Sequence, residues 1–72
     1  MTDEMRIRMA EGYLLEYLRE VGQPLSTEDL DSWRRSRELP VTPSDVQGAT
    51  WNLIERGEAA FTSDRRIVSV GA

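Results

Sequence analysis

The 72-residue sequence contains no cysteine and no histidine, and all nine of its basic residues are arginines. Without cysteine there are no disulfides or thiolate metal sites, and without histidine the commonest general base and metal ligand is missing. The absence of lysine also excludes Schiff-base chemistry and serine–lysine dyads. A domain of this size has a thin core and cannot form a deep catalytic cleft. We therefore expect that the protein is not an enzyme and has no cofactor or metal site.

Long hydrophobic runs are also absent. No apolar stretch approaches the roughly 20 residues of a membrane span or the 7–15 of a signal-peptide core, so we expect a cytoplasmic protein with no membrane partner. The formal net charge is −4, but it is unevenly distributed. Residues 1–33 hold three arginines against eight carboxylates, whereas residues 34–72 hold six arginines against five. An anionic partner would therefore dock on the second half of the chain.

Apolar periodicity predicts three helices, at about residues 3–21, 27–37 and 43–56. Gly22 is placed to end the first helix, and Gly57 is placed to end the third. Capping boxes are expected at the starts of the second and third helices, which carry Ser26 with Asp29 and Thr42 with Asp45. The acidic residues Glu28, Asp29 and Asp31 suit a helix start and are not interpreted as a magnesium site. The exposed face of the first helix is expected to carry Arg8, Glu11, Gly12, Glu16 and Arg19.

After Gly57 the apolar period changes from 3.6 to 2, which predicts a hairpin of two short strands over about residues 58–70. Residues 63–65 form its turn. A lone hairpin is marginally stable, so we expect Phe61, Val70 and either Ile67 or Val68 to rest on the helices. Leu25, in the link between the first two helices, is expected to be buried and to form a single β-bridge to the hairpin.

This order of elements resembles the winged helix-turn-helix superfamily, a mainly α fold of three helices plus a two-stranded antiparallel wing. The chain is then a single domain over residues 1–72. The resemblance rests on residues 22–26, 53–57 and 64–66. The step from Leu53 to Gly57 into a strand, followed by an Asp-x-Arg hairpin, is similar to the MarR-type branch, although the wing is shorter here. The resemblance implies a small DNA-binding transcriptional regulator or accessory factor, with Arg65 or Arg66 contacting the backbone or minor groove of double-stranded DNA.

In that fold the third helix enters the major groove. Its outward face is expected to carry Ser44, Gln47, Gly48, Trp51, Asn52 and Glu55. Gln47 and Asn52 can read adenine, and Ser44 can hold a phosphate. Phosphates on either side would be neutralised by Arg34, Arg35, Arg37, Arg65 and Arg66. However, no arginine lies at the centre of this face, and the Glu55 carboxylate would repel the DNA phosphates. An ordinary polar helix surface is therefore the alternative interpretation.

A second hypothesis is an acidic protein-interaction module that does not bind DNA, such as an assembly adaptor or a phage-type or host-type inhibitor. An exposed Trp51 would indicate a surface that a partner protein covers, and the alternative is that Trp51 packs under the hairpin or against the first helix. Met9 and Leu15, expected on the outer side of the first helix, could form a homodimer seam. The net negative charge favours a protein partner over a polyanion. The sequence leaves both hypotheses open.

Overall fold

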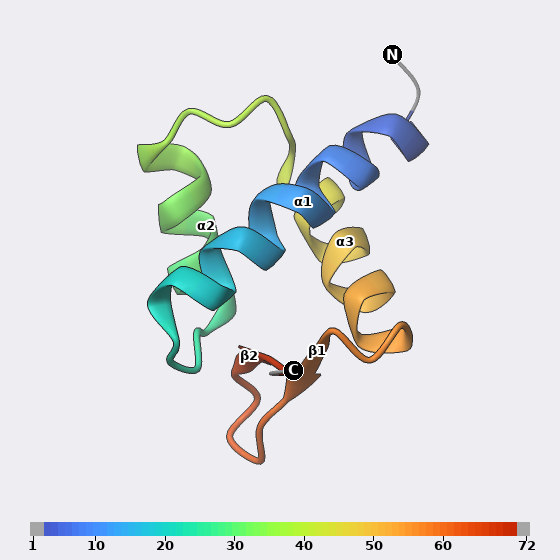
Figure 1. The fold of residues 1–72 in the computed structure, drawn as a ribbon. Helices are drawn as coiled ribbons and strands as arrows, with labels where there is room; N and C mark the ends of the chain where they lie inside the picture. The colour runs from blue at the N-terminus through green and yellow to red at the C-terminus, as the bar shows by residue number, and fades with distance from the viewer. Residues whose placement is uncertain (1–2, 71–72) are drawn as a thin grey trace.

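The computed structural model of the chain describes residues 3–70, which form three helices followed by a hairpin (Figure 1). The helices are α1 (Asp3–Val21), α2 (Thr27–Ser36) and α3 (Pro43–Glu55), and the strands are β1 (Ala59–Phe61) and β2 (Ile67–Ser69). The mainly α class with a small antiparallel hairpin is therefore confirmed. Each helix boundary lies within one residue of its predicted position.

Reciprocal hydrogen bonds cap the starts of α2 and α3, as predicted. The Ser26 hydroxyl accepts from the Asp29 N–H, and the Asp29 carboxylate accepts from the Ser26 N–H. Thr42 and Asp45 make the same pair of bonds at α3, where Pro43 begins the helix. These bonds satisfy backbone donors that the first helical turn leaves without a partner. The local sequence therefore determines where α3 begins.

The core lies where α1, α3 and β2 meet (Figure 1). Its largest fully buried side chains are Leu14 and Leu18 of α1, Leu53 of α3 and Ile67 of β2. On the other side, α2 contributes Leu30 and Trp33. Trp33 stacks on Tyr17 of α1, with ring centroids 4.7 Å apart. The buried face of α1 therefore contacts both of the other helices.

The hairpin is bound to the helices through one residue of the α1–α2 link. Leu25 is buried and bridges to Ile67, with backbone hydrogen bonds of 2.9 and 2.8 Å in the two directions, as predicted. Ile67 lies in the core, and Phe61 rests on α3 through its contact with Trp51 while remaining 44% exposed. Val70 is 46% exposed, so the prediction that it rests on the helices is wrong. Ala59 is buried. Phe61, two residues along the same strand face, instead meets the exposed Trp51 of α3.

Candidate nucleic-acid interface

The outward face of α3 carries four exposed residues at helical spacing: Ser44, Gln47, Trp51 and Glu55. Spacings of three and four residues place them in one stripe. The opposite side of the helix is buried through Val46, Ala49, Thr50 and Leu53. Four of the six residues predicted for the outward face are therefore exposed, including two of the three that can contact bases or phosphate by hydrogen bonds.

The other two residues, Gly48 and Asn52, do not belong to this face, so their predicted position is wrong. The Asn52 side chain is half-buried and donates to the carboxylate of Glu11 in α1 at 3.1 Å. Gly48 faces Ile7 of α1 so closely that a Cβ at this position would come within 3.2 Å of the Ile7 side chain. α1 therefore covers this flank of α3, and the Asn52 amide is already engaged within the fold.

Glu11 was predicted to lie on the exposed face of the first helix, but its side chain is buried. Its carboxylate accepts from Asn52 and also pairs with Arg56 at the end of α3. Arg56 bonds Glu58 at the start of the hairpin as well, and these two carboxylates raise the pKa of Arg56, with Glu58 the larger cause. A helical wheel of α1 alone underestimated how wide a face α3 covers. The cluster ties α1, α3 and the hairpin together.

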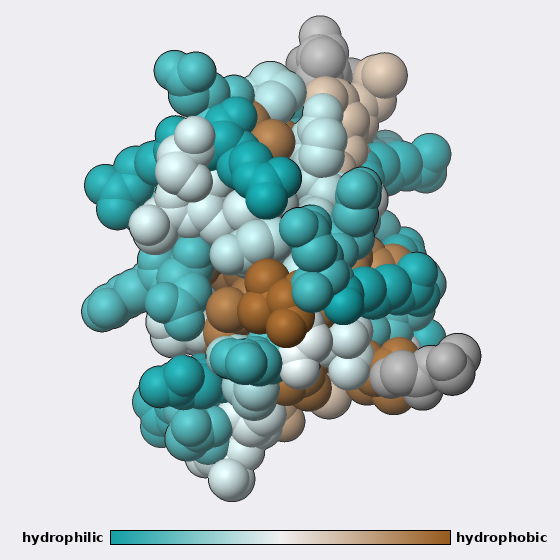
Figure 2. Space-filling view, turned by 60° about the vertical axis from the view of Figure 1, so that its left-hand side comes forward, coloured by the Kyte–Doolittle hydropathy of each residue, from teal (hydrophilic) through white to brown (hydrophobic). Residues whose placement is uncertain are grey.

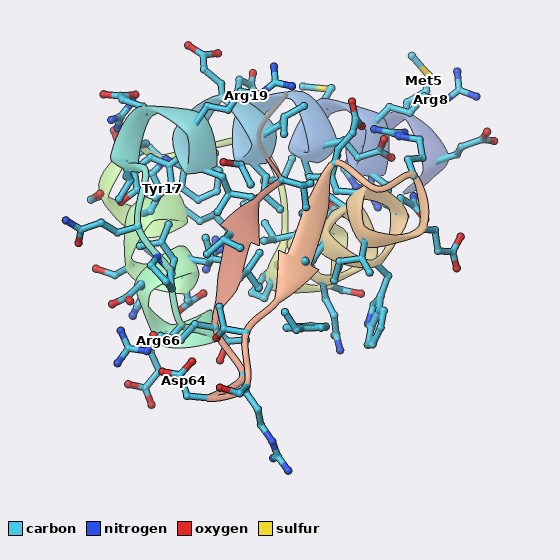
Figure 3. The ribbon with its side chains drawn as sticks, turned by 60° about the horizontal axis from the view of Figure 1, so that its bottom comes forward. Met5, Arg8, Tyr17, Arg19, Asp64 and Arg66 are labelled. Atoms are coloured by element: carbon cyan, nitrogen blue, oxygen red, sulfur yellow. The ribbon has the colours of Figure 1, made fainter. Side chains whose placement is uncertain are left out.

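The tip of the hairpin carries two arginines and one aspartate. Arg66 pairs with Asp64 at 3.2 Å, and the hydroxyl of Thr62 donates to Asp64. The Thr62 bond and, to a smaller degree, Arg66 hold the pKa of Asp64 below its usual value. The side chain of Arg65 has no hydrogen bond or ion pair with residues 3–70. The tip therefore keeps a net charge of +1, and it lies on the side of the molecule opposite α1 (Figure 3).

The arginines of α2 are partly neutralised by one carboxylate. Arg34 and Arg35 both pair with Asp31, at 2.9 and 3.1 Å. The Arg34 hydrogen bond is the main cause that lowers the pKa of Asp31. These three residues together keep a net charge of +1. Hydrophilic residues cover most of this side of the molecule, and hydrophobic surface gathers at its centre (Figure 2).

Arg37, the last of the predicted phosphate contacts, directs its guanidinium over the Tyr17 ring, 5.9 Å from the ring centroid. Its side chain therefore extends towards α1. Cation–π contacts at exposed positions are weak, so the contact with Tyr17 holds the Arg37 side chain only loosely. Arg37 is consequently less suited to a fixed phosphate contact than the arginines of the hairpin tip.

Trp51 joins α3 to the hairpin. Its ring meets Phe61 of β1 edge to face, with centroids 5.4 Å apart and an interplanar angle of 70°. Trp51 nevertheless remains 51% exposed. Beside the pair lies a groove of about 420 Å³ between α2, α3 and the hairpin, and its lining residues include Leu30, Arg34, Val46, Gln47 and Ile67 as well as the two aromatic rings. Sequence reasoning missed Phe61 as a surface residue because its place in the strand alternation indicated the core.

Met9 and Leu15 are half-buried and pack against the core, so their predicted position on the outer side of α1 is wrong. The large apolar side chains that α1 exposes are Met5 and Tyr13, 55% and 37% exposed. Met5 lies at the far end of α1 from the hairpin tip (Figure 3). The predicted homodimer seam therefore lacks the exposed apolar residues on which it was based.

No protein-family model, curated protein sequence or solved structure matches the chain. Within residues 3–70 there is no group of three or more acidic, histidine or cysteine side chains that could hold a metal ion. No helix in that part of the chain combines the length and apolar character needed to cross a membrane. The surface formed by α3 and the hairpin is the candidate functional site.

Proposed function

We propose that the chain is a winged helix-turn-helix DNA-binding domain that presents α3 and its hairpin wing to one duplex. The observation that carries the proposal is the contact between Trp51 and Phe61. It joins the outward stripe of α3, with Ser44 and Gln47, to the hairpin, so that helix and wing form one continuous surface. In the resembled fold this pair of elements faces the DNA.

The distribution of charge supports this orientation. The hairpin tip and the Asp31–Arg34–Arg35 cluster each keep one positive charge, and they lie on different elements around the groove beside α3. The exposed carboxylates of α1 include Glu16 and Glu20. α1 lies on the side opposite the hairpin tip, as the positions of Arg19 and Arg66 show in Figure 3. The acidic helix would therefore face away from a bound duplex.

Individual roles follow from side-chain chemistry. Gln47 would bond an adenine edge in the major groove. Ser44, in the first turn of α3, would hold a phosphate near the helix N-terminus, where backbone N–H groups favour anions. Arg65 and Arg66 would bind phosphates from the wing, and Arg35 would do so from α2. With few contacts and a net charge of −4, we expect micromolar affinity at low salt.

Fluorescence anisotropy with a labelled mixed-sequence duplex tests the proposal. Three phosphate contacts predict a slope of about −3 for log K against log salt. The double variant Arg65→Ala/Arg66→Ala should bind more weakly and reduce the slope by about 2. Arg8→Ala, which removes an exposed arginine from α1, is the matched control and should bind like the wild type. The proposal fails if no salt-dependent binding appears at high micromolar protein.

A second candidate function is recognition of a partner protein. The specific observation in its favour is that Trp51 and Phe61 are half-exposed beside a largely apolar groove, an arrangement typical of interface hot spots. Selection of a displayed peptide library against the wild type would test it, with Trp51→Ala as the counter-selection. Peptides that bind only the wild type, together with an absence of DNA binding, would favour this function over the first.

A further inference from the structure

We infer that the groove beside Trp51 receives one unpaired nucleobase, so that the domain prefers DNA carrying an unpaired base over fully paired duplex. This inference rests on the proposed DNA-binding function and adds the kind of DNA that the same surface selects. Its starting point is that the middle of the α3–hairpin surface is aromatic and hollowed, whereas its two ends are polar and cationic.

The shape and lining of the groove suit a flat aromatic ligand. Leu30, Val46 and Ile67 are buried residues that provide an apolar lining from all three elements, and Trp51 and Phe61 form the aromatic part. Because the two rings meet edge to face, Phe61 does not stack over the indole, which is consistent with the 51% exposure of Trp51. A nucleobase has two apolar faces that stack on such a ring.

Polar groups in the groove match the edges of a base. Gln47 is exposed there and offers both an amide donor and an acceptor. Arg34 also lines the groove, where the Nη2 of its guanidinium donates to Asp31. Base carbonyls and ring nitrogens are acceptors for amide and guanidinium donors. An aliphatic side chain from a partner protein offers no such acceptor.

The charges around the groove favour a nucleotide as the occupant. Arg66 directly precedes Ile67 of the groove lining, and it lies near enough to Asp29 at the start of α2 to contribute to the lowered pKa of that carboxyl, after the two Ser26 hydrogen bonds. Arg34 lines the opposite wall of the groove, on α2, and Arg35 pairs with Asp31 of the same wall. A strand whose phosphates contact the hairpin and α2 would therefore carry the intervening base across the groove.

The test compares three labelled probes by anisotropy: a matched duplex, the same duplex with one unpaired thymine, and an oligothymidine single strand. We expect the duplex with the unpaired thymine to bind about tenfold more tightly than the matched duplex. Tryptophan fluorescence should be quenched by the unpaired thymine more than by the matched duplex. Since Trp33 is buried, this change reports Trp51.

Variants separate stacking from overall binding. Trp51→Ala should lose the preference for the unpaired base, measured as the ratio of the affinities for the bulged and the matched duplex, and Trp51→Phe should retain much of that ratio. Tyr13→Ala, which removes a half-exposed aromatic ring from α1, is the control and should change neither. Circular dichroism establishes that each variant is folded.

Equal affinity for the matched and the bulged duplex overturns the inference and leaves the proposed function intact. Absence of binding to all three probes overturns both. A folded Trp51→Ala variant that keeps the preference shows that the base is not held at this groove, which also overturns the inference. Quenching of Trp51 by selected peptides but not by any DNA assigns the groove to a protein partner instead.

Discussion

The carboxylate of Glu11 holds the guanidinium of Arg56, which lies 45 residues away in sequence at the end of α3. The same carboxylate accepts from Asn52, one turn earlier in α3. One buried side chain of α1 thereby fixes the last turn of α3, from which the hairpin starts. The pair sets the position of the proposed interface without belonging to it.

Replacing Glu11 by alanine should lower the free energy of unfolding by about 1–2 kcal/mol, because Asn52 and Arg56 both lose an acceptor. Glu11→Gln keeps an acceptor for Asn52 and should cost less. The measurement is urea denaturation at neutral pH. Glu16→Ala, on the exposed side of α1, is the control and should stay within about 0.5 kcal/mol of the wild type. Equal effects of the Glu11 and Glu16 variants would contradict this account.

Gly12 and Gly48 both lie inside helices, but their surroundings differ. A Cβ at Gly12 would meet nothing within 4 Å, so Gly12→Ala should stabilise the domain by about 1 kcal/mol through helix propensity. A Cβ at Gly48 would press on the Ile7 side chain at 3.2 Å, so Gly48→Ala should gain clearly less. Thermal melts of the two single variants check the order, and a reversed order would show that α1 does not lie against Gly48.

Arg65 has a φ of 63°, in the left-handed region that favours glycine. Arg65→Gly should therefore stabilise the hairpin by about 0.5–1 kcal/mol, since the conformational cost outweighs the flexibility that glycine adds. The same variant should bind DNA more weakly if Arg65 contacts phosphate. Ser63→Gly is the control because Ser63 has a negative φ, and it should not stabilise. Opposite changes in stability and affinity would support a binding role for Arg65, whereas parallel changes would argue against it.

Acid should destabilise the domain through its capping carboxylates. The Thr42 N–H bond, with a smaller contribution from Arg6, holds the pKa of Asp45 below its usual value, and Ser26 does the same for Asp29. A pKa that is lower in the folded than in the unfolded state stabilises the fold above the unfolded value, near pH 4 for aspartate. That stability is lost as the pH falls through the folded value.

We therefore expect the melting temperature to fall when the pH is lowered from about 5 to about 2. Asp45→Asn keeps an acceptor for the Thr42 N–H but does not titrate, so its melting temperature should change less over this range. Thermal melts followed by circular dichroism at several pH values make the comparison. An identical pH dependence in both proteins would mean that Asp45 is not among the responsible groups.

Features that depend on neighbouring residues were predictable from the sequence. The capping boxes of α2 and α3 need only residues three positions apart, and Gly22 and Gly57 have positive φ values where the helices were expected to end. The bridge of Leu25 to the hairpin was also predicted. It follows from a short extended link that must pass between two helices and the strands.

Features that depend on where one helix meets another were not predictable. The helical wheel of α1 placed Glu11 on the exposed face, because the pattern of one helix does not show how much of its surface a second helix covers. Asn52 and Gly48 were misplaced for the same reason. Strand alternation correctly put Ala59 and Phe61 on one face, but it does not show that Phe61 meets an exposed side chain of α3, Trp51, rather than the core. The aromatic groove at the proposed interface, which Trp51 and Phe61 line, was not predictable for this reason.

The bridge between Leu25 and Ile67 has a consequence for how the domain opens. The Ile67 N–H donates to the Leu25 carbonyl, and the Ile67 carbonyl accepts from the Leu25 N–H. The backbone polar groups of Ile67 therefore point to Leu25 and not to Phe61, the residue opposite in β1. The last strand therefore cannot separate from the body without also freeing the link between the first two helices. The amide protons of Leu25 and Ile67 should exchange with solvent as slowly as those of Leu53 at the centre of the core. Such exchange would show that the hairpin, although it comes last in the chain, belongs to the same cooperative unit as the helices.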